Sequence, residues 1–596
     1  MTALLDAPAD TPVDIAPPGA RGVPRPGAHP GAASRLARAR PARLPDLLLV
    51  LALSGVIVVT HGWHLGAGPG FGDDEGTYTA QAYAVSHFGT LAHYTYWYDH
   101  PPLGWLLMTG WDQTLGRLLH PATAVEGGRQ FMVAVAAVTG ALIFALGRRL
   151  GLARWACVAA VLAWALSPLA LSYSRMVYLD NVGVAFLLGA LVLACSPRRH
   201  LWAFAGAGLL LAAAVLSKET LLLSAPAVAA AVWGRSAGKT RPFCVAAFGT
   251  TLATVLALYP LFALLKGEFF AGPEHVSLLD ALRFQLTSRP STGSPLSSGS
   301  GSAQLVGRWV ATDPWLLASS VLLAPLALAV RRLRVPALAV AVPVLVGLRP
   351  GYLPDPYVVA LLAPGALVVA GLLDGGVRQV ATRLGGRVVG LPARVREELA
   401  AAGSLAVPAV VAVSPGRYRR LSRARRLVPA TIAAVLAVVL LGAAAAAVGP
   451  RWTSTRQALY ADRGGQRLVA AEDWIAGNVP HDARAVVDDT LWVDLVRRGF
   501  DPHRGVIWFY KTDFTNNLDP SVAQTLPNGY RDLGYVVVTP VLRAALEQLP
   551  QGLAQLRAAV RYSEVLTTIG TGPERIEVRK VVVPPDAPVL PSPVRP

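Results

Sequence analysis

The sequence predicts a mainly α-helical, polytopic membrane protein that ends in a small α/β domain. Of its 596 residues, 53% are hydrophobic and only 15% are charged, and the mean hydropathy is +0.45. That composition is more apolar than a soluble core of this length could bury. Long apolar stretches also recur along the chain, and a helix needs roughly 20 such residues to cross a bilayer core of about 30 Å. Together these observations favour a bundle of membrane helices.

About eleven apolar segments are candidate membrane spans. They cover residues 46–60, 131–146, 155–171, 182–195, 201–216, 220–233, 243–265, 314–330, 335–348, 357–373 and 427–448. Arg-rich loops alternate with the other loops, and basic residues mark the cytoplasmic side. This rule places the N-terminus and the basic loop 374–427 in the cytoplasm, and everything after residue 450 outside it.

Composition divides the chain into three predicted parts. Residues 1–45 are rich in Pro, Gly and Arg and are expected to form a disordered cytoplasmic arm, with the first apolar run acting as a signal anchor. Residues 46–449 form the transmembrane domain, with a first external loop at 62–128. In residues 450–596, helical periodicity alternates with short β-rich runs, which predicts an extracytoplasmic α/β domain with a partly parallel sheet.

The net charge of +18 is explained by these basic loops, which would contact anionic membrane lipid. We therefore expect no nucleic-acid partner. Arg greatly outnumbers Lys, which favours a bacterial origin and a plasma-membrane location. Cys157, Cys195 and Cys244 lie near the cytoplasmic ends of predicted spans, where packing is expected and disulfides are not.

The first external loop contains an unusual density of polar groups. Asp73, Asp74 and Glu75 precede a run in which Tyr78, with Gln81, Ala82 and Val85, lies on one helical face. One interpretation is that the acids only cap a helix, because helix N-termini favour acidic side chains. The functional interpretation is that one acid is a general base whose pKa is raised by partial desolvation at the membrane surface.

Further along the same loop, the run HYTYWYDHPPLGW brings Tyr98, Asp99 and His100 to the start of a second helix. The two prolines keep Asp99 and His100 extended and begin that helix, so both side chains are rigidly placed. His100 could contact a phosphate there, together with free backbone amides. The aromatic residues are explained equally well by an interfacial belt or by stacking on a sugar.

These two motifs resemble the first external loop of the phospholipid-carrier-dependent glycosyltransferases of the GT-C superfamily. That group includes the protein O-mannosyltransferases and the lipid A aminoarabinose transferases. The order and spacing of DDEGTY and YDHPPLGW match a DE pair followed by an acid-Lys-Pro-Pro motif. The resemblance implies that Asp74 is the catalytic base, with Glu75 beside it and Asp73 as an alternative. His100 stands where the aminoarabinose enzymes have a phosphate-contacting Lys, and Thr77 stands where they tend to have Arg.

The resemblance continues less specifically through SYSRMVYLDN and LSKET, which implies roles for Arg175, Asp180 and Lys218. Snorkelling or helix capping is the competing explanation for these three residues. Arg349, in LRPGYLPDP, is added from topology alone. Substrate contacts are thus expected from a set of eight residues: Tyr78, Tyr98, Asp99, His100, Arg175, Asp180, Lys218 and Arg349.

The implied reaction moves a sugar from a polyprenyl-phosphate donor to a hydroxyl of a glycan, lipid or protein acceptor on the extracytoplasmic face, with inversion. The acid removes the acceptor proton, and cations stabilise the phosphate leaving group. We expect no cofactor. The acids of the first external loop could hold a divalent metal, but the resemblance favours catalysis without one.

Two other functions remain open from the sequence. A transporter or lipid flippase would need ionisable residues near the middle of several spans, and these spans are nearly bare Ala, Leu and Val. A noncatalytic membrane receptor with an external binding domain would use the acid-rich loop only structurally.

Overall fold

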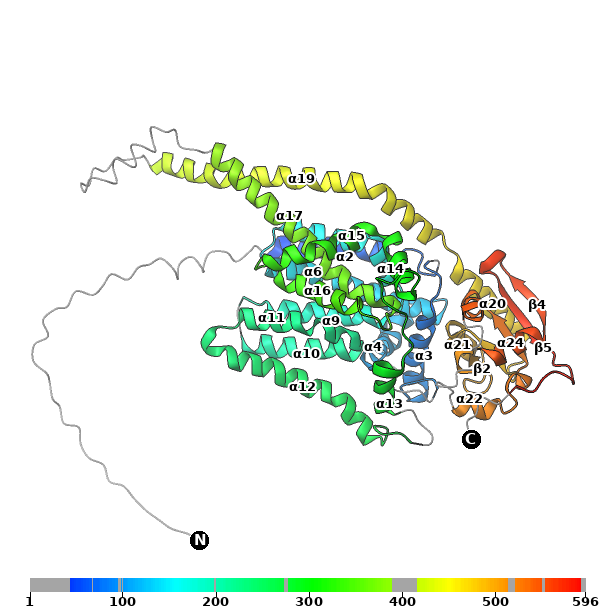
Figure 1. Ribbon diagram of the computed structural model, residues 1–596. Helices are drawn as coiled ribbons and strands as arrows, with labels where there is room; N and C mark the ends of the chain where they lie inside the picture. Colours follow the sequence, from blue (N-terminus) through cyan, green and yellow to red (C-terminus); the bar gives the residue numbers. More distant parts are fainter. Residues whose placement is uncertain are drawn as a thin grey trace, which may run out of the picture. The chain divides into compact units, whose positions relative to one another are not determined.

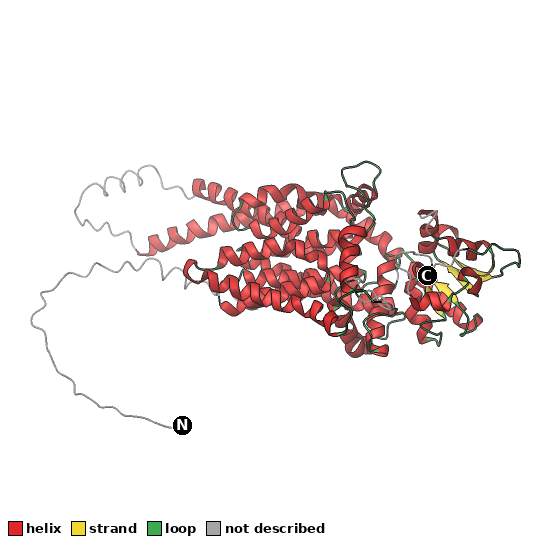
Figure 2. Ribbon diagram, turned by 60° about the horizontal axis from the view of Figure 1, so that its bottom comes forward, coloured by secondary structure: helices red, strands yellow, loops and turns green. Residues whose placement is uncertain are grey.

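The computed structural model describes residues 43–590, apart from 67, 95–97, 99, 198–199, 273–276, 389–414, 513–519 and 549–552. Contacts divide the chain into residues 1–48 and 49–596, and the candidate site lies entirely in the second unit. Helices make up most of this unit, and its strands gather near the C-terminal end of the chain (Figure 2).

Twelve helices correspond to the predicted spans. They are α2 (Arg43–Gly62), α6 (Ala124–Arg149), α7 (Arg154–Leu166), α8 (Pro168–Arg175), α9 (Leu179–Ala194), α10 (Leu201–Ser217), α11 (Ala225–Arg235), α12 (Arg241–Leu265), α15 (Pro314–Ala329), α16 (Arg334–Gly347), α17 (Val359–Val388) and α19 (Pro415–Ala461). Among the described residues, five helices are long and apolar enough to cross a membrane, or up to seven if two bent pairs each count as one span. Helices α9, α10 and α16 are shorter apolar helices. The predicted fold class, a mainly α bundle of the polytopic membrane type, is confirmed.

One predicted span, residues 155–171, is two helices that meet at an angle of 65°. Pro168 cannot donate a backbone hydrogen bond and disfavours a helical conformation at Ser167, so α7 ends there. The Ser167 hydroxyl then accepts a hydrogen bond from the Ala170 amide and caps α8. The bend places Arg175 at the end of α8.

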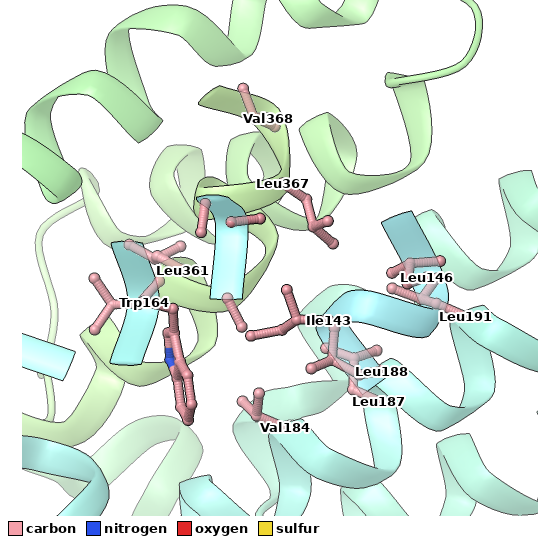
Figure 3. Packing of buried hydrophobic residues seen from close by; sticks show 14 of the residues in the cluster. Ile143, Leu146, Trp164, Val184, Leu187, Leu188, Leu191, Leu361, Leu367 and Val368 are labelled. Atoms are coloured by element: carbon pink, nitrogen blue, oxygen red, sulfur yellow. The ribbon is translucent and has the colours of Figure 1, made fainter. Parts of the chain in front are cut away.

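The core of the bundle is packed by α6, α7, α9 and α17. Figure 3 shows Ile143 and Leu146 of α6 beside Leu187 and Leu191 of α9, with Leu367 of α17 above them. All five side chains are fully buried. The buried side chains fix the positions of these four helices. The polar residues at the ends of the helices are thereby fixed as well.

The three cysteines are buried and form no disulfide among the described residues, as the sequence predicts. Cys157 and Cys195 belong to this same core. Figure 1 shows α9, α10 and α12 running side by side, in agreement with their extensive contacts.

Shorter helices lie between the helices of the bundle. They are α3 (Asp73–Phe88), α4 (Leu103–Trp111), η1 (Asp112–Gly116), α5 (Arg117–Leu119), η2 (Glu219–Ser224), η3 (Gly238–Thr240), α13 (Leu278–Arg283), η4 (Phe284–Ser288), α14 (Gly301–Thr312) and η5 (Asp355–Val358), with only η3 on a predicted cytoplasmic loop. Helix α4 begins directly after Pro101 and Pro102, and residues 75–82 of α3, which include Tyr78, Gln81 and Ala82, are all buried. The sequence therefore predicted both helices of the first external loop.

The C-terminal part contains a five-stranded sheet among the described residues, in the order β2-β1-β3-β5-β4. Its elements are α20 (Gly464–Asn478), β1 (Ala485–Val487), α21 (Asp489–Arg497), β2 (Val506–Trp508), η6 (Phe509–Lys511), α22 (Pro520–Thr525), η7 (Gly529–Asp532), β3 (Tyr535–Val538), α23 (Pro540–Gln548), α24 (Ala554–Arg561), β4 (Ser563–Ile569), η8 (Gly572–Glu574) and β5 (Ile576–Val581). Strand β1 is parallel to β2 and β3, whereas β5 is antiparallel to β3 and β4.

The prediction of a partly parallel sheet with covering helices is confirmed. The sequence did not reveal β2, which has only three residues, or β4, whose side chains are largely exposed and so lack an apolar alternation. The exact limits of the three predicted domains stay a prediction.

Candidate active site

A cavity of about 700 Å³ opens between the first external loop, the α10–η2 junction and the turn before η5. Asp74 of α3 lies on its wall, together with His100, Lys218, Arg289 and Arg349. The wall thus places one carboxylate of the predicted acid cluster in the same space as several basic side chains. These residues come from four separate stretches of the chain, which only the folded bundle brings together.

The first turn of α3 is held in place by Glu75, which is completely buried. One carboxylate oxygen accepts hydrogen bonds from the Gly72 amide at 2.9 Å and from Arg129 at 2.6 Å. The other accepts from Arg129 Nε at 2.8 Å and from the Val177 amide at 2.9 Å. Glu75 therefore acts as the predicted helix cap and as the partner of a buried arginine. Its neighbour Asp74 lines the cavity.

Three side chains form a row beside the cavity at the end of α10. Lys218 Nζ lies 2.9 Å from His100 Nε2, and His100 Nδ1 lies 3.1 Å from both carboxylate oxygens of Glu219. Lys218 also donates to the Tyr78 hydroxyl at 3.3 Å. Lys218 and His100 are 3% and 7% exposed, so this polar row is largely removed from water where it meets the cavity.

Arg289 and Tyr352 also line the cavity. The Arg289 guanidinium lies 3.6 Å from the centre of the Tyr352 ring, and Gln285 accepts a 2.6 Å hydrogen bond from it. Burial raises the pKa of the Tyr352 hydroxyl; Arg289 lowers it and the charge of Asp74 raises it. Asp74 and Arg289 thus act on the same hydroxyl group, which places both charges around one part of the cavity.

The Gly/Ser-rich segment before α14 supports this wall. The Thr292 amide donates to the Gly351 carbonyl at 3.0 Å, and the Leu353 amide donates to the Thr292 hydroxyl at 3.0 Å. Ser294 donates to the Leu348 carbonyl at 2.7 Å. The segment is therefore hydrogen-bonded to the turn that carries Arg349 and Tyr352.

Several predicted site residues lie elsewhere among the described residues. The Tyr98 hydroxyl donates to Glu268 at 2.8 Å, and the Arg175 guanidinium donates to the carbonyls of Trp63 and His64 at 2.7 and 2.8 Å. Neither of them lines the cavity in the part of the chain that the structure describes. Arg175 instead fastens the chain where it leaves α2.

The three remaining predicted site residues are the acids Asp180, Asp73 and Asp99. Asp180 is 2% exposed at the start of α9, in the electrostatic field of Lys218, rather than on the cavity wall. Asp73 is the first residue of α3. Asp99 lies outside the described residues.

The sequence did not point to Glu219, Arg289, Tyr178 or Tyr352, which all line the cavity. Glu219 directly follows Lys218 in the LSKET motif, so its position next to a predicted site residue could have indicated it. Arg289 and Tyr352 are separated by more than sixty positions, and no local pattern connects them. Among the described residues, no group of three or more His, Cys, Asp or Glu side chains is placed to hold a metal ion. Catalysis without a metal cofactor stays a prediction.

Comparison with known proteins adds a family match and a fold match. Residues 99–263 match the family model described as dolichyl-phosphate-mannose-protein mannosyltransferase. The structure of ArnT from Cupriavidus metallidurans in the apo state is similar at a TM-score of 0.51 and 15% identity, covering 90% of this chain and 98% of that one. The same protein bound to undecaprenyl phosphate is similar at a TM-score of 0.50 and 14% identity, covering 95% of this chain and 100% of that one.

The chain has the GT-C fold. The resemblance seen in the two loop motifs is thereby confirmed at the level of the fold. A search of the curated proteins found no match.

Within this GT-C fold, the family match begins at Asp99 and ends in α12. It includes His100, Lys218 and Glu219, the row of side chains beside the cavity. It leaves out α3 with Asp74, and the wall formed by Arg289 and Tyr352, which the tertiary structure alone connects to that row.

Proposed function

We propose that this protein transfers a sugar from a polyprenyl-phosphate carrier to a hydroxyl group of an acceptor on the extracytoplasmic face, with inversion at the anomeric carbon. One observation carries the proposal: a single cavity of about 700 Å³ contains the carboxylate of Asp74 and the basic side chains of Lys218, Arg289 and Arg349. The reaction needs a base to take the acceptor proton and cations to stabilise the departing phosphate, and this cavity contains both kinds of group.

Asp74 is the general base in this mechanism. The acceptor oxygen attacks the anomeric carbon as Asp74 takes the hydroxyl proton, and the bond between that carbon and the phosphate oxygen breaks. The electron pair of the broken bond leaves with the polyprenyl phosphate. Attack and departure occur on opposite faces of the sugar, so one displacement inverts the configuration.

The cations stabilise the charge that develops on the departing phosphate. Lys218 lies at the end of α10, and Arg289 lines the same cavity with its guanidinium stacked on Tyr352. Preorganised cations in a site of low dielectric favour a developing anion more strongly than water does. A guanidinium fixed by stacking loses little further freedom when it binds a phosphate oxygen.

A membrane assay with labelled donors tests the proposal. Polyprenyl-phosphate mannose, arabinose and glucose are offered separately to membranes that contain the full chain, and transfer of label to lipid, glycan and protein fractions is measured. Asp74→Asn should abolish transfer while protein levels stay normal, and Asp73→Asn, made separately, should retain it. Asp482→Asn, an exposed acid in the turn after α20, serves as a matched control and should be fully active.

Each negative result has a distinct meaning. If none of the donors is consumed by the wild type, the proposed reaction is refuted for these sugars and carriers. If transfer survives in Asp74→Asn but disappears in Asp73→Asn, the base has been assigned to the wrong carboxylate. If both variants are active, neither acid is the base.

A further inference from the structure

The row formed by Glu219, His100 and Lys218 has only one consistent arrangement of protons at neutral pH. A lysine ammonium group has donors and no acceptor, so the contact of 2.9 Å requires His100 Nε2 to accept a hydrogen bond from Lys218. The other ring nitrogen, Nδ1, then carries the proton of the neutral ring. It donates to the Glu219 carboxylate, whose two oxygens both lie 3.1 Å away.

We propose that His100 is a neutral bridge and not a phosphate-binding cation, and that Glu219 is a positioning residue that holds the Lys218 ammonium on the cavity wall by acting through His100. The proposal rests on the proposed function, because it assigns Lys218 as the cation of this row that meets the donor phosphate. It differs from the expectation drawn from the sequence, in which His100 itself contacts the phosphate.

The surroundings explain why such a bridge is needed. The lysine side chain is a flexible four-carbon stem, and its position must be set by partners. Lys218 has Tyr78 on one side and His100 on the other, and the Tyr259 hydroxyl donates to the His100 carbonyl at 3.3 Å. The Glu219 carboxylate accepts the Nδ1 proton of His100 and so favours the tautomer in which Nε2 accepts from Lys218. A proton on Nε2 would repel the ammonium group.

Simple electrostatics and the bridge predict opposite effects of removing Glu219. A carboxylate beside a phosphate site repels the ligand, so its removal alone should strengthen binding of an anionic lipid. If Glu219 instead keeps Lys218 in place, its removal should weaken binding. The sign of the change therefore distinguishes a positioning residue from a bystander.

The first experiment measures equilibrium binding of labelled undecaprenyl phosphate to the purified full chain in detergent, with undecaprenol as the probe that lacks phosphate. We expect Glu219→Ala to weaken binding of the phosphate lipid about tenfold or more, and Glu219→Gln, which can still accept the Nδ1 hydrogen bond, to weaken it less. Binding of undecaprenol should not change. Asp355→Asn is the matched charge control, since Asp355 lines the same cavity, and it should bind the phosphate lipid slightly more tightly.

The second experiment tests the charge state of His100. A carboxamide has one donor and one acceptor, so His100→Gln can donate to Glu219 and accept from Lys218 without ever carrying a charge. We expect His100→Gln to bind the lipid within about tenfold of the wild type. His100→Ala, which breaks the bridge, should bind as weakly as Glu219→Ala.

Three results would overturn the inference. They are unchanged or tighter binding in Glu219→Ala, loss of binding in His100→Gln as severe as in His100→Ala, and equal weakening in Asp355→Asn and Glu219→Ala. Failure of the proposed function is recognised separately, because it appears as a wild type that does not distinguish undecaprenyl phosphate from undecaprenol.

Discussion

Thr77 of helix α3 donates a 2.6 Å hydrogen bond to Asp489, which follows strand β1 of the C-terminal sheet. A second contact lies nearby, where the Ala124 amide at the start of α6 donates to Asp494 at 2.9 Å. In open α/β sheets the carboxyl ends of parallel strands commonly form a ligand crevice. Here the helix that carries Asp74 packs against α21, the helix that follows β1, so the C-terminal part supports the candidate active site.

Gly76 allows this close packing, and a larger residue there should separate the two parts. A Cβ atom at position 76 would lie 2.3 Å from the backbone of Asp489 and Thr490. We expect Gly76→Val to displace the C-terminal domain and to reduce sugar transfer at least tenfold, with increased sensitivity to limited proteolysis after α19. Gly110→Ala in α4 is the control, because a Cβ there meets nothing within 4 Å. Normal activity and normal proteolysis in Gly76→Val would contradict the support role.

The buried pair of Arg129 and Glu75 should contribute strongly to stability. Both side chains are completely buried, so removing one partner leaves an uncompensated charge. We expect Arg129→Ala to lower the free energy of unfolding by about 3–5 kcal/mol. Thermal unfolding of the purified protein in detergent measures this loss.

Arg308→Ala is the matched control for that measurement. Arg308 forms a longer pair with Asp355 at 3.8 Å, and both side chains are substantially exposed. The expected loss is below about 1 kcal/mol, because exposed ion pairs contribute little. Similar losses in the two variants would mean that burial of the Arg129 pair has no special importance.

Arg289 should contribute to donor affinity through both its charge and its stacking on Tyr352. Arg289→Ala is expected to raise the KM for the lipid-linked donor about tenfold, and Arg289→Lys to restore part of the affinity because it keeps the charge but not the planar contact. Steady-state transfer kinetics measure both. Arg283→Ala, an exposed arginine on neighbouring α13, should leave the KM unchanged. An unaltered KM in Arg289→Ala would remove this residue from the phosphate site.

His93 should make the protein less stable in acid. Burial lowers the pKa of His93 to about 3, with smaller contributions from Lys511 and His503, and neither ring nitrogen has a hydrogen-bond partner among the described residues. An unfolded chain gains a proton at this histidine below about pH 6.5, whereas the folded chain stays neutral down to its lower pKa. Stability should therefore fall as pH decreases through that window, by up to about 1.4 kcal/mol per pH unit.

His93→Phe removes the titrating group while keeping an aromatic ring beside Trp492. We expect the Tm of the variant, relative to the wild type, to rise as pH is lowered from about 7 to about 5. Thermal unfolding at several pH values provides the measurement. A difference in Tm that stays constant across this range would show that His93 is not protonated preferentially in the unfolded chain.

The sequence predicted well those structural elements that neighbouring residues determine. Apolar length predicted the bundle, and the proline pair after His100 predicted the start of α4, because both depend on neighbouring residues only. The bend between α7 and α8 was missed, although Pro168 could have indicated it. Strands β2 and β4 were missed because short or exposed strands lack a periodic apolar pattern.

The candidate site was only partly predictable. The acid cluster and His100 stood out by their density in one loop, and Lys218 by resemblance. The sequence could not predict that Asp74 lines the cavity while Glu75 is buried. The burial of Glu75 depends on Arg129, a residue more than fifty positions away. Arg289 carried no signal, since its position depends on the turn that contains Tyr352.

The sequence by itself determined that the chain is a helical membrane protein, and it predicted candidate site residues in the loop after the first span. Hydropathy and local motifs act over a few residues, so they can be seen without a structure. Only the tertiary structure decided that Asp74 shares a cavity with Lys218 and Arg289, and that Glu219 reaches Lys218 through His100. Those relationships depend on how distant helices pack, and packing is a property of the whole bundle.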